Sequence, residues 1–276
     1  MKDENIKVFL DTINYIENNE FLSDAVNKSR RNTKIYKEKI NLNFCINKSG
    51  IVNVTKNRSF DAAMRLQKHY PDKKIGVLNF ASATNPGGGV TKGSSAQEES
   101  LCRISTLYNV LNSKYLLEHF YTPNRLKNNP LHDDTVIYTP DIVICKSDNA
   151  SPTRLKKEEF IKVDVLTCAA PNLREKPANS YNLGEGNAVK VSDQELYEIH
   201  LKRARQILNV ALVNNIDILV LGAFGCGAFK NNPYVVAKAY KDILKEYRNY
   251  FDLIEFAIFI NEYNKENYLA FKIVAE

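Results

Sequence analysis

The chain has 276 residues, 44% of them hydrophobic and 25% charged, which are ordinary values for a globular protein. Its formal net charge of +6 favours anionic partners, but the basic residues form only short clusters, unlike the long basic stretches of duplex-binding proteins. No apolar stretch approaches the roughly 20 residues that span a membrane, and the first residues do not resemble a secretory signal. We therefore expect a cytoplasmic protein that requires neither a membrane nor a nucleic acid.

The first part of the chain is predicted to be helical over residues 5–40, because apolar residues from Ile6 to Ile16 recur at helical spacing. Residues 1–45 are accordingly interpreted as an N-terminal helical extension. Apolar runs typical of buried strands follow it. They cover residues 51–54, 75–80, 136–138, 142–145, 163–167, 216–221 and 254–259. Helical stretches lie between them, at residues 60–69, 98–111, 194–213 and 234–247.

This alternation predicts the fold class. Apolar strands that alternate with amphipathic helices indicate a mostly parallel sheet covered by helices on both faces, which is a three-layer α/β/α fold. The polar segment 171–191 is expected to be a long loop, and such loops are often functional. No repeat or composition break divides the chain, so we expect a single domain over residues 1–276.

The cysteines and histidines do not have the spacing of a metal site. The five cysteines are scattered without a Cys-x-x-Cys pair, and the four histidines show no paired spacing. Structural zinc sites and disulfide frameworks depend on such pairs. We expect no metal, no cofactor and no disulfide framework.

Two glycine-rich segments follow predicted strands, where ligands bind in open α/β sheets. Glycines at such positions let backbone N–H groups approach phosphates closely. Neither segment has the spacing of a P-loop or of a dinucleotide-binding fingerprint, which disfavours a P-loop ATPase and an ordinary dehydrogenase. The first segment contains Gly87, Gly88 and Gly89, and the second contains Gly225, Cys226, Gly227, Ala228 and Phe229.

A pair of glutamates stands shortly after the triple glycine. Ser95 and Glu98 have the spacing of a capping box at a helix start. Capping explains Glu98 but does not require Glu99. In the alternative, the glycine loop wraps a substrate and delivers Glu99 to a glycosidic bond, whose cleavage needs a proton donor for the leaving oxygen. The spacing alone leaves both interpretations open.

The triple glycine, seven further residues and then Gln97-Glu98-Glu99 resemble the signature of poly(ADP-ribose) glycohydrolases. The segment from Leu78 to Pro86 resembles the microbial type of that family, and the similarity extends over nearly the whole chain. The resemblance implies a macrodomain fold, with a mixed sheet between helices and ADP-ribose bound across the strand ends.

The resemblance also implies roles for individual residues. Glu99 would be the general acid and base, Glu98 would orient the reacting ribose through its hydroxyls, and Asn85 is a candidate neighbour of that ribose. The implied ADP-ribose contacts are Gly87, Gly88, Gly89, Gln97, Asn85, Gly225, Cys226, Gly227, Ala228 and Phe229. Within this set the second loop would cradle the diphosphate, and Phe229 would pack against the terminal ribose.

The expected activity is hydrolysis of ribose–ribose bonds in poly(ADP-ribose), which releases ADP-ribose mainly from chain ends. The substrate would be the polymer or an ADP-ribosylated protein, and the enzyme would act as a monomer. Two alternatives stay open: a hydrolase for mono-ADP-ribose on protein or nucleic acid, and a non-catalytic ADP-ribose-binding module. A thiol hydrolase that uses Cys226 is disfavoured, because neither loop contains a histidine to act as its base.

Overall fold

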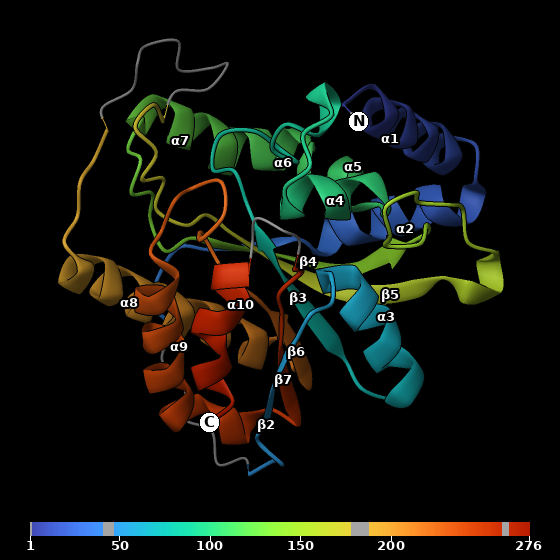
Figure 1. Cartoon of the computed structure of the whole chain (residues 1–276). Coiled ribbons are helices and arrows are strands. Elements are labelled where there is room, and N and C mark those ends of the chain that lie inside the picture. Colours follow the sequence, from blue (N-terminus) through green and yellow to red (C-terminus); the bar gives the residue numbers. More distant parts are fainter. Residues whose placement is uncertain (1, 41–46, 178–187, 261–264) are drawn as a thin grey trace.

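The computed structural model describes residues 2–40, 47–177, 188–260 and 265–276 (Figure 1). Its strands form one seven-stranded sheet in the order β1-β4-β5-β3-β6-β7-β2. The strands from β5 to β2 in that order are parallel, whereas β4 is antiparallel to β5 and to β1. The predicted mixed, mostly parallel sheet is therefore confirmed. The strands are β1 (Lys34–Tyr36), β2 (Ile51–Thr55), β3 (Ile75–Phe80), β4 (Val136–Ile144), β5 (Ile161–Cys168), β6 (Ile218–Leu221) and β7 (Leu253–Ala257).

Helices cover both faces of the sheet (Figure 1). One layer contains α1 (Lys2–Glu17), α2 (Glu20–Asn32), α3 (Ser59–His69), η1 (Val90–Lys92), α4 (Gln97–Arg103), α5 (Leu107–Leu111), α6 (Lys114–Leu116), the π-helical turn η2 (Leu117–Tyr121) and α7 (Thr122–Lys127). The other contains α8 (Asp193–Val213), α9 (Pro233–Tyr247), α10 (Lys265–Phe271) and η5 (Lys272–Val274). Two further single turns are η3 (Lys157–Glu159) and η4 (Arg248–Tyr250). None of the helices in the described ranges is long and apolar enough to cross a membrane.

The apolar strand sequences follow from burial on both faces. Along β3, Val77 joins the core cluster under α1–α5, and Leu78 joins the cluster under α8–α10. Along β6, Val220 belongs to the first of these clusters and Leu221 to the second. A strand between two helical layers must be apolar at consecutive positions, which explains why its sequence is a continuous run and not an alternating one.

The N-terminal region differs from the predicted helical extension. The helix is interrupted between α1 and α2. At this point the Asn19 side chain accepts a hydrogen bond from Leu22 N at 3.1 Å and caps α2. Helix α2 ends at Asn32, and β1 then pairs with β4, so this region contributes a strand to the sheet. Its last positions, 41–45, lie outside the described residues.

Two predicted boundaries inside the chain are also wrong. The helix expected over 98–111 is divided into α4 and α5, because the Thr106 hydroxyl accepts a hydrogen bond from Val143 N at 3.0 Å and draws the chain against β4. The two strands expected at 136–138 and 142–145 are one strand, β4, with a register shift between Thr139 and Ile142. Of the expected loop 171–191, residues 171–177 and 188–191 form neither helix nor strand, and 178–187 lie outside the described residues.

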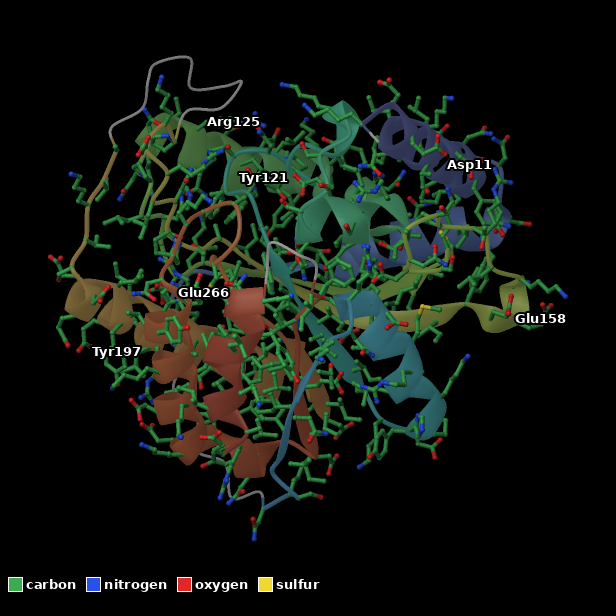
Figure 2. All side chains as sticks on the ribbon, in the orientation of Figure 1. Asp11, Tyr121, Arg125, Glu158, Tyr197 and Glu266 are labelled. Atoms are coloured by element: carbon green, nitrogen blue, oxygen red, sulfur yellow. The ribbon has the colours of Figure 1, made fainter. Side chains whose placement is uncertain are left out.

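Helix α1 is fixed to the rest of the fold by charged side chains. Asp11, labelled on α1 in Figure 2, forms ion pairs with Lys146, at 2.8 Å, and with Arg154. The Lys146 side chain is buried and also donates to Val8 O at 2.8 Å. These contacts connect α1 to the segment that follows β4.

Candidate functional site

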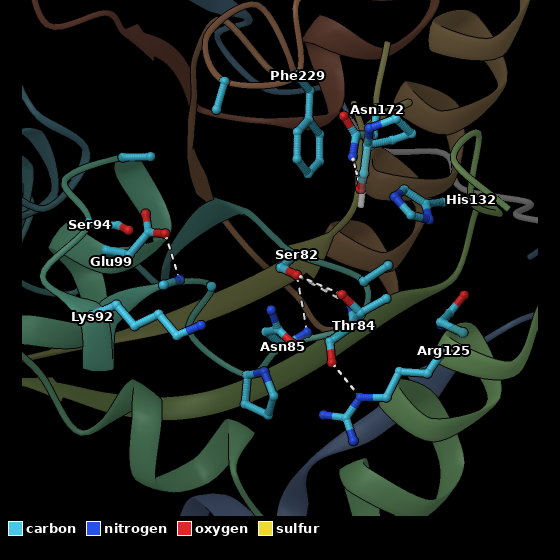
Figure 3. Close-up of a pocket in the computed structure, with 18 of the residues that line it drawn as sticks. Ser82, Thr84, Asn85, Lys92, Ser94, Glu99, Arg125, His132, Asn172 and Phe229 are labelled. Atoms are coloured by element: carbon cyan, nitrogen blue, oxygen red, sulfur yellow. Dashed lines mark hydrogen bonds between the residues drawn. The ribbon is translucent and has the colours of Figure 1, made fainter. Parts of the chain in front are cut away.

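A cavity of about 960 Å³ opens at the sheet edge where β3, β5 and β6 end (Figure 3). These strands are parallel neighbours, so the segments that follow them meet at one edge. The cavity wall brings together residues of both predicted loops, namely Asn85, Gly88, Gly89, Glu99, Ala228 and Phe229. The other predicted site residues do not line it; these are Gly87, Gln97, Glu98, Gly225, Cys226 and Gly227.

Glu99 stands in the first turn of α4, at the wall of the cavity. Gly89 N donates a 2.8 Å hydrogen bond to Glu99 Oε1, shown as a dashed line in Figure 3. The other oxygen, Oε2, is buried and accepts no hydrogen bond from the described residues. One oxygen is thus fixed by the glycine loop, and the other is available to exchange a proton with a bound molecule.

Glu98 lies behind Glu99, and its side chain is buried. Ser82 N donates to Glu98 Oε2 at 2.8 Å, and Asn79 Nδ2 donates to Oε1 at 3.3 Å. Burial raises the pKa of Glu98 well above its usual range, and the negative charge of Glu99 adds to the effect. Glu98 therefore connects α4 to the segment after β3. The capping-box interpretation of Ser95 and Glu98 is wrong, because the N-cap residue of α4 is Ala96 and no side chain caps the helix.

Gln97 faces the strand end and not the cavity. Its amide donates to Leu78 O at 2.8 Å and to Ser59 Oγ at 3.0 Å, and its Oε1 accepts a hydrogen bond from Phe80 N at 2.9 Å. Two of these hydrogen bonds hold α4 against the end of β3, and the third connects it to the start of α3. Gln97 and Glu98 together fix the helix start that carries Glu99.

The second glycine loop forms the opposite side of the cavity. The N–H groups of Gly227, Ala228 and Phe229 donate no hydrogen bond to any described residue, and Gly227 and Ala228 are exposed. Three consecutive N–H groups without a partner in the described ranges, two of them at the cavity wall, are suited to bind an anion. The Phe229 ring also faces the cavity, with the Arg174 guanidinium 5.8 Å from its centroid.

Cys226 does not have the environment of a nucleophile. Burial raises the pKa of its thiol far above the usual range, which disfavours the reactive thiolate. The thiol donates to Phe224 O at 3.6 Å, and within the described ranges no histidine forms a hydrogen bond with it. The structure therefore weakens the hypothesis of a thiol hydrolase.

Several cavity residues were not found from the sequence. His132 has a backbone φ of 56°, and its ring centroid lies 6.3 Å from that of Phe229. Burial lowers its pKa to about 4, so the imidazole is neutral near pH 7. Arg125 donates from Nε to Thr84 O at 2.7 Å and closes the lower side of the cavity in Figure 3. Lys92 and Asn172 complete this polar wall.

His132 and Arg125 belong to segments that have no apolar periodicity and no motif, so no signal in the sequence distinguishes them from ordinary loop residues. Lys92 stands inside the glycine–glutamate signature, but at a position to which that signature gave no role. Among the residues that the structure describes, no group of three or more His, Cys, Asp or Glu side chains is arranged to hold a metal ion. The four described cysteines are free thiols.

Comparison with known proteins identifies relatives of this architecture. A family model described as "Microbial-type PARG, catalytic domain" matches residues 4–147. No curated protein matches the chain significantly. The poly(ADP-ribose) glycohydrolase of Thermomonospora curvata, solved with the inhibitor ADP-HPD, is 27% identical over 97% of this chain and 98% of its own, with a TM-score of 0.78. The enzyme of Deinococcus radiodurans, solved with ADP-ribose, is 29% identical over 90% of this chain and 95% of its own, with a TM-score of 0.70.

Proposed function

The chain belongs to the family of microbial-type poly(ADP-ribose) glycohydrolase catalytic domains, and we propose that it hydrolyses the ribose–ribose bonds of poly(ADP-ribose) with Glu99 as general acid and base. The observation that supports this role is the asymmetry of the Glu99 carboxylate. Gly89 N fixes one oxygen, and the other is buried without a partner among the described residues at the cavity wall. A carboxyl group held in this way presents one atom to the scissile bond.

ADP-ribose lies between the two glycine loops in this proposal. Its diphosphate accepts hydrogen bonds from the free N–H groups of Gly227, Ala228 and Phe229, and the Phe229 ring packs on the terminal ribose. Asn85 faces the reacting ribose, since its Oδ1 is buried and has no partner among the described residues. Five residues shape the loops from outside the cavity wall: Gly87, Gln97, Glu98, Gly225 and Cys226.

The reaction has two steps. As the bond between ribose C1″ and the 2′-oxygen breaks, Glu99 gives its proton to that oxygen, and the neighbouring chain leaves as an alcohol. Water then adds to the cationic C1″ and gives one proton back to the Glu99 carboxylate. Burial raises the pKa of Glu98, so Glu98 behind the reacting carboxyl keeps its own proton up to a higher pH than an exposed carboxyl would. The products are ADP-ribose and a shortened chain.

The finer features of the proposal concern how the polymer enters. We propose that the enzyme cleaves the polymer at its ends. The first turn of α1 closes one side of the cavity with Lys2, which leaves no passage there for a chain that continues beyond the site. One domain over residues 1–276 that acts as a monomer is sufficient for this chemistry, because every site residue named above comes from the same chain.

The decisive experiment compares wild type with Glu99→Gln. The glutamine keeps an oxygen for Gly89 N but cannot give or take a proton. Hydrolysis of poly(ADP-ribose) should fall by about 10²–10⁴-fold, while titration calorimetry still detects ADP-ribose binding. Glu118→Gln is the control, since Glu118 is exposed on η2. Undiminished turnover by Glu99→Gln contradicts the assignment, and release of the last protein-linked unit would identify a mono-ADP-ribosyl hydrolase.

A further inference from the structure

We propose that His200 and Asn231, neither of which lines the cavity, position the second glycine loop and thereby determine the affinity for the ADP-ribose unit. The proposal rests on the proposed function. His200 lies on α8 and is 1% exposed, and Asn231 follows the loop and is 2% exposed. The His200 Nε2 atom is 2.7 Å from Asn231 Oδ1.

Asn231 connects the ends of two strands. Its Nδ2 donates to Pro171 O, after β5, at 2.7 Å, and to Phe229 O, in the loop after β6, at 3.1 Å. Its backbone N–H donates to Gly225 O at 3.1 Å. The side chain therefore fixes the loop at its first glycine and at its aromatic residue, on both sides of the three free N–H groups.

The direction of these hydrogen bonds assigns the proton on His200. Because both hydrogens of Asn231 Nδ2 are donated to backbone carbonyls, the oxygen Oδ1 must face the imidazole. His200 therefore carries its hydrogen on Nε2 and donates it to Asn231. The other nitrogen, Nδ1, is buried without a partner among the described residues. Burial, with a smaller contribution from the charge of Arg203, lowers the pKa of His200 to about 4, so this neutral tautomer persists at pH 7.

The loop is packed tightly against Asn231. Gly225 has a φ of 80°, and a Cβ atom added there would lie 2.6 Å from Ala170 Cβ and 3.0 Å from Asn231 Cγ. No side chain fits between the loop and Asn231, so a shift of Asn231 moves the loop. The Phe224 ring, at the start of the loop, contacts His200 edge-on with a centroid distance of 5.8 Å. His200 thus contacts Phe224, which precedes the loop, and Asn231, which follows it.

The test compares two substitutions on the same helix. His200→Leu removes the donor to Asn231, and Gln206→Leu is the matched control. Gln206 is 5% exposed on α8 and donates to Glu38 O at 2.9 Å, away from the loop. Both variants should lose some thermal stability, but only His200→Leu should bind ADP-ribose about tenfold more weakly and show a raised KM with a smaller change in kcat. His200→Gln, which retains a donor, should restore most of the affinity.

A measurement on the unaltered protein covers the case in which His200→Leu does not fold. Nitrogen-15 NMR of the imidazoles should show His200 protonated at Nε2 and unprotonated at Nδ1 at pH 7. The opposite tautomer overturns the proposal, and so does equal weakening of ADP-ribose binding by His200→Leu and Gln206→Leu. If the wild type neither binds ADP-ribose nor cleaves the polymer, the proposed function fails. If the wild type does both and His200→Leu binds equally well, only this inference fails.

Discussion

Gly88 packs so closely against Glu99 that a Cβ atom added to Gly88 would lie 2.5 Å from Glu99 Oε1. The same atom would lie 3.0 Å from Glu98 Oε2, and Gly88 has a φ of 59°. The absence of a side chain at this one position therefore allows both carboxylates to stand beside the loop. The triple glycine and the glutamate pair form one unit, because the loop backbone occupies the space next to the acids.

Gly88→Ala should remove most of the activity. The methyl group must displace the Glu99 carboxylate, which also breaks its hydrogen bond from Gly89 N, and the positive φ adds a cost of about 1–3 kcal/mol. We expect polymer hydrolysis to fall by about 100-fold or more, since misplaced catalytic groups lose their advantage in position. Gel analysis of polymer loss, together with a thermal melt, measures both effects. Near-normal turnover would contradict the described packing.

Gly227→Ala tests the second loop with the same substitution. A Cβ atom at Gly227 has no atom within 4 Å, and its φ is not in the left-handed region. The free protein should therefore keep its thermal stability within about 0.5 kcal/mol. Affinity for ADP-ribose should nevertheless fall, because the methyl group stands where the diphosphate approaches the N–H groups of the loop. Unchanged affinity, measured by calorimetry, would place the diphosphate elsewhere.

Glu98→Gln should increase the stability of the folded protein. An acid whose pKa is raised by folding binds more protons in the folded than in the unfolded state, so its contribution to stability falls as the pH rises above about 4.5. Glutamine removes that cost, so we expect the variant to be more stable than wild type at pH 7. The Asn79 amide, whose Oδ1 has no partner among the described residues, can turn to accept from the new Nε2.

Urea unfolding between pH 4.5 and 8 measures this effect. The difference in free energy of unfolding between Glu98→Gln and wild type should grow with pH in this range. A variant that is less stable than wild type at every pH would show that Glu98 is stabilising in its charged form.

The sequence was sufficient to predict the part of the site that depends on parallel strands. The apolar runs of β3 and β6 mark buried strands, and strands that run parallel bring the loops after Phe80 and Leu221 to one edge. That geometry requires only the order and direction of the strands. In the structure, Glu99 and Phe229, whose roles the family resemblance implied, line the cavity at that edge.

The rest of the site depends on contacts between distant segments. Ser95 and Glu98 fit a capping box locally, but Glu98 instead accepts hydrogen bonds from Ser82 N and Asn79, which are close only in the folded chain. His132 comes from a segment without periodicity and enters the cavity through a left-handed backbone conformation. A local pattern cannot reveal either arrangement, because in each case the competing interaction is long-range.

Gly93→Ala should reduce both stability and activity, because α1 supports the first loop. Gly93 has a φ of 74°, and a Cβ atom added there would lie 2.3 Å from Lys2 O. Asn5 Nδ2 also donates to Gly93 O at 2.9 Å. The methyl group would push α1 away from the segment that leads to Glu99. Gly50→Ala is the control for a left-handed glycine, with a φ of 64° and a clash at the Asn249 side chain, far along the chain from the loop.

Gly93→Ala and Gly50→Ala should therefore differ in activity but not in their loss of stability. Both should lower the melting temperature, each by the cost of a strained backbone of about 1–3 kcal/mol. Only Gly93→Ala should lose polymer hydrolysis when both are assayed well below their melting temperatures. Equal activity of the two variants would mean that α1 does not support the catalytic loop.

The buried histidines should make the protein less stable in mild acid. The pKa of His200 and of His132 is lowered by burial to about 4 in the folded chain, from an ordinary value of 6.5. Between these values the unfolded state binds more protons, so stability is complete above pH 6.5 and is lost as the pH falls toward 4. The loss for His200 is roughly 3 kcal/mol at most. In urea unfolding at pH 7.5, 6.5, 5.5 and 4.5, His200→Gln should lose less stability with acid than wild type. Replacement of His119, which is exposed, is the control for removal of an imidazole. If His200→Gln shows the full acid sensitivity of wild type, His200 is not the group that titrates.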